Sequence, residues 1–63
     1  MNGINLNNRH FLTPSEAAKV LSVSRSTVYR LISYGEIPAV NIRKAKRIPV
    51  KAVLEILDGL QNP

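Results

Sequence analysis

The stretch LTPSEAAKVLSVSRSTVYRLISYGEIP, residues 12–38, contains two helical patterns separated by a very short turn. At its start, Thr13 is suited to the N-cap, Pro14 to the first helical position and Glu16 to the closing position of a capping box. Apolar residues then recur at helical spacing as far as Leu21. These signals predict a first helix over residues 14–21.

A second helical pattern begins at Ser24, a favourable N-cap because its hydroxyl can accept a hydrogen bond from a first-turn amide. Gly35 is suited to the left-handed position that ends a helix, and Pro38 prevents the helix from resuming. Between these signals one narrow apolar stripe recurs at helical spacing: Val28, Leu31 and Ile32. Ala18 is small enough to let this second helix cross the first closely. The pattern favours a helix-turn-helix, and it is also compatible with an ordinary helical hairpin.

The next segment, AVNIRKAKRIPV, predicts a small β-hairpin. Alternating apolar residues over 39–42 indicate one strand, residues 47–49 indicate its partner, and a basic tip lies between them. The tip lacks the Gly or Asn that two-residue hairpin turns prefer. A third helix follows, and Gly59 is predicted to end it. Its expected apolar face consists of Val50, Val53, Leu54 and Leu57.

The predicted fold class is mainly α with a small β-hairpin, that is, three helices plus a two-stranded wing. We expect one winged helix-turn-helix domain over residues 11–60, a flexible tail over residues 1–10 and a C-terminal tail over residues 61–63. Phe11 and Tyr34 are expected to pack on the core.

Composition limits the classes of function. Nine Lys and Arg oppose four Asp and Glu among 63 residues, a net charge of +5 that favours a polyanionic partner. With no cysteine and His10 as the only histidine, we expect no disulfide, metal site or cofactor. The apolar runs are too short for a membrane span or a signal peptide, which favours a soluble, cytoplasmic protein. An enzyme is the least expected class because no obvious nucleophile and base pair is present.

The polar face of the second helix is the main candidate for binding double-stranded DNA. Opposite Val28, this face carries hydroxyl, phenol and guanidinium groups, and residues 22–33 contain no acid. A helix fits the major groove, where Arg25 and Arg30 could bind a guanine edge or clamp a phosphate. The candidate contacts on this helix are Ser24, Arg25, Ser26, Thr27, Tyr29 and Arg30. The alternative is a merely solvated polar face.

The hairpin tip is the second candidate site, because four positive charges lie within five residues: Arg43, Lys44, Lys46 and Arg47. Such a wing would contact phosphates or the minor groove beside the recognition helix. The alternative is a flexible basic loop. On the third helix, Ile56 and Leu60 lie at the edge of the apolar face, where they either widen the core or dock another protein.

Motifs along most of the chain resemble one family. The segments FLTPSEAAKVLSVSRSTVYRLISYGEIPAV and RIPVKAVLEIL, on either side of a basic hairpin, resemble the excisionase family of small winged helix-turn-helix proteins. These proteins are akin to the DNA-binding domain of MerR-type regulators. The resemblance implies that the second helix enters the major groove and the wing the minor groove. The wing departs from the family pattern, since Ala45 stands near the tip where glycine is usual.

The resemblance also implies a role. An excisionase of a bacterial or phage mobile element binds and bends attachment-site DNA, so that an integrase, usually a tyrosine recombinase, excises the element. Because bending is costly, we expect neighbouring copies to bind cooperatively and the free protein to be a monomer. One alternative is a small transcriptional regulator of a prophage or integrated element. An alternative of another class is a protein-interaction module that binds an acidic partner.

Overall fold

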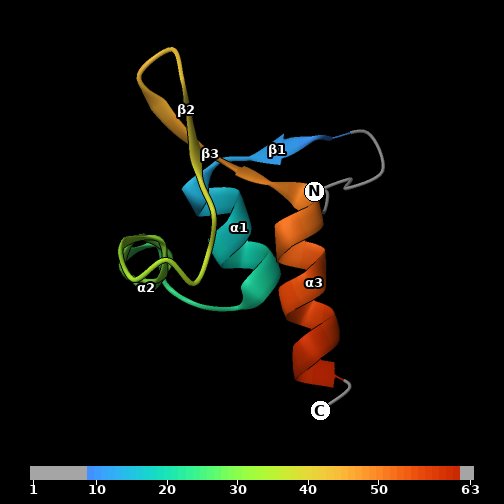
Figure 1. The fold of residues 1–63 in the computed structure, drawn as a ribbon. Helices are drawn as coiled ribbons and strands as arrows, with labels where there is room; N and C mark the ends of the chain where they lie inside the picture. The colour runs from blue at the N-terminus through green and yellow to red at the C-terminus, as the bar shows by residue number, and fades with distance from the viewer. Residues whose placement is uncertain (1–8, 62–63) are drawn as a thin grey trace.

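The structure is a computed structural model that describes residues 9–61; the side chains of residues 60 and 61 are not among those described. Figure 1 shows α1 at the centre, with α2 on one side, α3 on the other and a hairpin projecting from the body. The predicted fold class, three helices with a small antiparallel sheet, is confirmed. The elements in chain order are β1 (Phe11–Leu12), α1 (Pro14–Leu21), α2 (Arg25–Ser33), β2 (Val40–Ile42), β3 (Ala45–Pro49) and α3 (Val50–Gln61).

Helix α1 has the predicted bounds because its capping box forms. The Glu16 amide donates to Oγ1 of Thr13 at 3.1 Å, and the Thr13 amide donates to Oε1 of Glu16 at 2.9 Å. Pro14 occupies the first turn, where its missing amide hydrogen costs nothing. The side chains of Thr13 and Glu16 thereby satisfy two backbone amides that have no carbonyl partner within the helix.

Both helices of the pair end in a left-handed residue. Ser22 has φ 60° after α1, and Gly35 has φ 78° after α2. After α2, the Gly35 amide donates to the carbonyl of Ile32 at 3.0 Å and the Glu36 amide to that of Leu31 at 2.9 Å. This pair of bonds is the Schellman motif, in which glycine is usual because a side chain disfavours positive φ. The predicted role of Gly35 is confirmed.

The sheet contains one strand more than the predicted hairpin. Its order is β1-β3-β2, with both pairs antiparallel, so β3 is the central strand. The short strand β1 pairs Phe11 with Pro49 and Leu12 with Ile48. Two residues are too few to produce a period-two pattern, which is why β1 could not be predicted. The hairpin itself runs from β2 to β3, as predicted.

The core lies where the sheet, α1 and the inner faces of α2 and α3 meet. Leu12 and Ile48 fill the inner face of the sheet, and Val28 anchors α2 with its side chain completely buried. The buried apolar residues are Leu12, Ala17, Ala18, Val28, Ile37, Ile48, Val50 and Val53. Ala18 is among them, in accord with the predicted close crossing of the first two helices.

Three expectations about packing and one about the end of a helix are wrong. Phe11 is 38% exposed, because its register opposite Pro49 turns it to the outer face of the sheet. Tyr34 is 67% exposed, since it follows α2 at the C-cap rather than within the apolar stripe. Leu54 is 46% exposed, because α3 turns Val53 toward the core and Leu54 lies about 100° around the helix from it. Gly59 does not end α3, which continues to Gln61.

The structure describes only part of each expected tail. Residues 1–8 of the expected N-terminal tail lie outside the described residues. Arg9 and His10, its last two residues, contact the domain: Arg9 pairs with Glu16, and the His10 carbonyl accepts from the Val50 amide at 3.0 Å. At the other end, Gln61 is the last residue of α3. No helix within residues 9–61 is long and apolar enough to cross a membrane.

Candidate nucleic-acid interface

The polar face of α2 is exposed, as predicted. Arg25, Ser26, Tyr29 and Arg30 are all exposed, whereas Val28 is buried and Leu31 is half-buried against the core. The side chains are sorted in this way because the apolar stripe recurs at the helical period, which leaves the opposite side to water. The helix therefore presents two guanidinium groups, a phenol and a hydroxyl without an acid among them.

Two of the predicted contact residues have a structural role at the start of α2. The Thr27 amide donates to Oγ of Ser24 at 3.1 Å, and the two hydroxyl oxygens lie 2.8 Å apart in a hydrogen bond. Ser24 is therefore the N-cap, and Thr27 is half-buried beside it. These hydroxyls stabilise the first turn of α2, and that part of the helix positions the exposed Arg25.

Arg25 is also held from outside its own helix. Its Nη1 donates to Oγ of Ser15, in the first turn of α1, at 3.5 Å. Ser15 is exposed, so it places a second hydroxyl beside the start of α2. Sequence reasoning did not include Ser15, because no local pattern links two residues ten positions apart across the interhelical turn.

The hairpin tip is a two-residue turn formed by Arg43 and Lys44. The register pairs Ile42 with Ala45, and both tip residues have positive φ, 53° and 67°. Positive φ at both central residues is typical of a type I′ turn, which usually contains Asn-Gly. The tip is therefore shorter than predicted: Ala45 and Lys46 belong to β3. Two long cationic side chains occupy backbone positions that ordinarily favour glycine.

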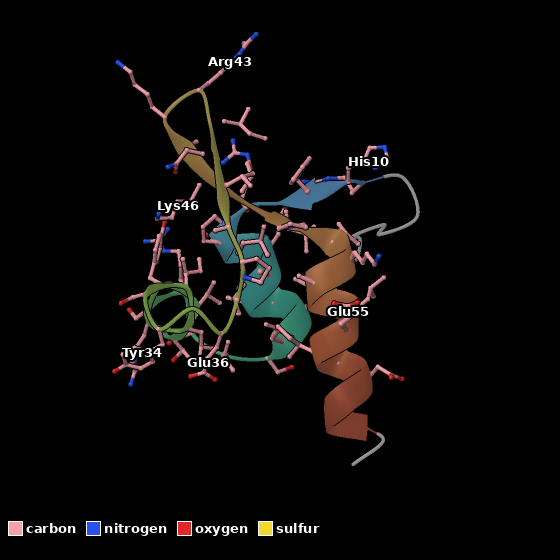
Figure 2. The ribbon with its side chains drawn as sticks, in the orientation of Figure 1. His10, Tyr34, Glu36, Arg43, Lys46 and Glu55 are labelled. Atoms are coloured by element: carbon pink, nitrogen blue, oxygen red, sulfur yellow. The ribbon has the colours of Figure 1, made fainter. Side chains whose placement is uncertain are left out.

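The four predicted wing cations do not share one direction. Arg43 and Lys44 lie at the tip, while Lys46 and Arg47 follow each other on β3 and so point to opposite faces. Figure 2 shows Arg43 at the far end of the hairpin and Lys46 on the side nearer α2. Arg47 is half-buried, and its Nη1 donates to the Lys46 carbonyl at 2.9 Å. Lys46 thus lies on the face of the hairpin nearer α2, and Arg47 lies on the opposite face.

The four acidic residues lie outside the polar face of α2 and outside the β2–β3 hairpin. Glu36 follows the C-terminal end of α2, and Glu55 lies on α3, across the molecule from the hairpin (Figure 2). Glu16 is paired with Arg9, and this hydrogen bond, together with one from the Thr13 amide, lowers the pKa of Glu16. The polar face of α2 and the hairpin therefore carry exposed cations with no acid among them, and we call these five residues the basic surface: Arg25, Arg30, Arg43, Lys44 and Lys46.

For Ile56 and Leu60 the two alternatives are a wider core and a surface that docks another protein. Ile56 is half-buried and packs against the core, which accords with the first alternative. The side chain of Leu60 lies outside those described. Within residues 9–61, no three His, Cys, Asp or Glu side chains are grouped to hold a metal ion.

Comparison with known proteins identifies the family. The family model described as "Helix-turn-helix domain" matches residues 11–60, which is most of the chain. This protein therefore belongs to that helix-turn-helix family, as the packing of α1 against α2 and the exposed face of α2 indicate. No solved structure matches the chain.

Three relatives illustrate the range of names in the family. "Putative DNA-binding protein Rv0500A" from Mycobacterium tuberculosis is 45% identical over 75% of this chain and 60% of its own length. "Probable excisionase" from Saccharopolyspora erythraea is 46% identical over 76% of this chain and 49% of its own. "Putative antitoxin VapB50" from Mycobacterium tuberculosis is 43% identical over 84% of this chain and 42% of its own. The chain thus spans about half the length of the curated relatives that it matches.

Proposed function

We propose that this protein binds double-stranded DNA at specific sequences, with α2 in the major groove and the hairpin tip against the adjacent minor groove or its phosphates. The observation that carries the proposal is the acid-free, exposed face of α2, with Arg25, Tyr29 and Arg30, in a molecule whose projecting hairpin ends in two cations. Helix-turn-helix family membership and a relative named as a putative DNA-binding protein support it. Phosphate contacts would fix position, and a few base contacts would choose the site.

Within this class, we propose the role of an excisionase. The protein would bind and bend attachment-site DNA so that an integrase, a tyrosine recombinase, excises a mobile element in the cytoplasm. The relative named as a probable excisionase supports this role. Bending a short site costs on the order of 1–6 kcal/mol, which is large for so small a domain. A monomer in free solution would therefore act through cooperative neighbouring copies on DNA or together with the integrase.

DNA binding is tested by selecting duplexes from a random pool and titrating the selected duplex at several salt concentrations. Affinity should fall steeply with salt and should exceed that for a scrambled duplex at every concentration. Arg30→Ala should cost about 1–3 kcal/mol of binding free energy and relax the sequence preference at one position. Lys51→Ala is the matched control, since it removes one exposed positive charge from α3.

Two results would refute this proposal. Equal affinity for selected and scrambled duplexes would exclude sequence-specific recognition. Affinity independent of salt would exclude a phosphate-binding surface and favour a protein-interaction module with an acidic protein partner.

A second candidate role is a small transcriptional regulator of a prophage or integrated element. The observation behind it is that relatives of nearly equal identity have other names, a putative antitoxin among them. Genome-wide mapping of bound DNA separates the two roles. Occupancy of a recombination attachment site, with excision lost on deletion of the gene, supports the excisionase. Occupancy of a promoter, with altered transcription and normal excision, supports the regulator.

A further inference from the structure

The hairpin has two chemically different faces. Residues directly opposed in an antiparallel pair point to the same face, and successive residues alternate between faces. The register therefore places Asn41 and Lys46 together on one face. The opposite face carries the pairs Val40–Arg47 and Ile42–Ala45.

The face with Val40 and Ile42 is turned away from the core. Ile48 lies two residues after Lys46 on β3 and is completely buried, so the Lys46 face continues into the inner side of the sheet. On the other face, Val40 is 43% exposed and Ile42 is 42% exposed, and neither is among the residues packed on the core. This face therefore exposes two apolar side chains that do not pack on the core cluster.

Ile42 is the more prominent of the two. It is the last residue of β2, directly before the turn, and its cross-strand neighbour Ala45 is too small to cover it. Arg43 and Lys44 form the turn that follows, and Figure 2 shows Arg43 at the far end of the hairpin. No acidic residue occurs anywhere in residues 37–54. The extremity of the molecule therefore combines one uncovered apolar side chain with two adjacent cations.

This combination fits the DNA minor groove. Phosphates line its rims, deoxyribose rings form apolar walls, and its width is about 6 Å. A hairpin that ends in a two-residue turn has a narrow end, and apolar residues such as Ile are known wedges between base steps. An acidic protein surface could match the cations as well, but the apolar side chain beside them favours a partner with apolar walls between anions.

We propose that Ile42 enters the minor groove as an apolar wedge and is the residue through which the protein bends DNA, while Arg43 and Lys44 bind the phosphates on either side. This inference rests on the proposed DNA-binding function. Val40 lies two residues further from the tip on the same face, so it remains outside the groove. Positive φ at both tip residues supports the assignment, because backbone strain of this kind concentrates at functional sites.

The test compares Ile42→Thr with the matched control Val40→Thr. Each replaces an exposed, β-branched apolar residue of β2 by a β-branched polar one, so strand propensity is retained. A third variant, Ile42→Leu, restores an apolar side chain at the tip. Each protein is titrated against the duplex selected by the wild type, and the bend is measured by energy transfer between dyes at the duplex ends. Thermal unfolding establishes that every variant is folded.

For Ile42→Thr we expect binding about tenfold weaker and a bend smaller by about 20° or more, because one wedge is lost. Val40→Thr and Ile42→Leu should match the wild type in both measurements. A folded Ile42→Thr that bends DNA as the wild type does would overturn the role of Ile42 and leave the proposed function intact. If Ile42→Thr lost only cooperativity between adjacent sites, the face would be a protein contact and the wedge would be wrong. Wild-type protein that binds without bending overturns both the wedge and the excisionase role.

Discussion

The two ends of α2 and the tip of the β2–β3 hairpin use opposite kinds of residue. At the ends of α2, Ser24 caps the free amides and Gly35 takes the left-handed position at no steric cost. At the hairpin tip, Arg43 and Lys44 occupy left-handed positions that Asn and Gly would fill with less strain. The ends of α2 use residues that stabilise the backbone, and the tip uses residues that carry charge.

Stability explains the residues found at the ends of α2. It does not explain the two cations at the hairpin tip, where a functional requirement acts as well. Local choices that agree with the fold are the rule in natural proteins, and exceptions concentrate at functional sites. On that reasoning the tip is the part of this molecule whose sequence is least explained by stability. Substitutions in the two regions test this contrast.

The largest loss of stability is expected at Val28 in α2, and Val40 in the hairpin is the matching residue that should show almost none. Val28→Ala removes completely buried apolar volume from α2 and should lower the free energy of unfolding by about 1.5–3 kcal/mol. Val40→Ala, on the exposed strand β2, should change it by less than about 0.5 kcal/mol. Denaturant titration of both variants measures the difference. Equal losses would show that the hairpin packs as tightly as the helix pair.

Two glycines test the backbone argument. Gly35 has φ 78° and open space where a side chain would lie, so Gly35→Ala meets no clash and its cost is conformational. We expect a loss of about 1–2 kcal/mol. Gly59→Ala, also in open space but inside α3, should instead stabilise the protein by about 0.5–1 kcal/mol. A stabilising Gly35→Ala would contradict the left-handed geometry after α2.

The hairpin tip is tested by giving it the residues that its backbone favours. Arg43→Asn with Lys44→Gly should raise the free energy of unfolding by about 1–2 kcal/mol, by relieving strain at two positive-φ residues. The same change should weaken DNA binding and flatten its salt dependence by about two phosphate contacts. Arg43→Gln with Lys44→Gln is the control, since it removes the same charges and keeps the strain. If both double variants were equally stable, strain at the tip would be excluded.

The smallest effect is a pH dependence at the start of α1. Hydrogen bonds from the Arg9 guanidinium and from the Thr13 amide hold the pKa of Glu16 below its ordinary value of 4.5. A carboxyl group with a lower pKa in the folded state stabilises that state above its unfolded pKa, and the stabilisation is lost as the pH falls through the folded pKa. Stability should therefore decline below pH 4.5, and less steeply in Glu16→Gln.

Urea titrations at a series of acidic pH values measure this difference between the wild type and Glu16→Gln. Arg9→Met removes the larger of the two causes and should reduce the difference as well. A Glu16→Gln variant with an unchanged slope would show that the capping box is not maintained in solution.

The helix pair could be predicted from the sequence because its signals are local. The capping box at Thr13, the N-cap at Ser24 and the stop at Gly35 each lie within a few residues of the backbone groups that they satisfy. The exposed face of α2 followed from the position of Val28 alone. Periodicity within one helix is enough to sort such a face from the core.

The remaining features depend on contacts between distant segments. Strand β1 exists because Leu12 meets Ile48, and Phe11 is exposed because of that same register. The division of Lys46 and Arg47 between two faces depended on where the turn ends, and a tip without Gly gave no signal for a two-residue turn. Ser15 joined the candidate site through the crossing of α1 and α2. None of these follows from a pattern within a single element.

Strand β3 ends at Pro49, and α3 begins at the very next residue. On this side the base of the hairpin has no hinge: β3 is paired with β1 and continues directly into a helix that packs on the core. A force applied at the tip would be transmitted into the body of the protein instead of being absorbed by a flexible joint. A hairpin attached in this way would keep its shape on binding, and the DNA duplex would deform instead.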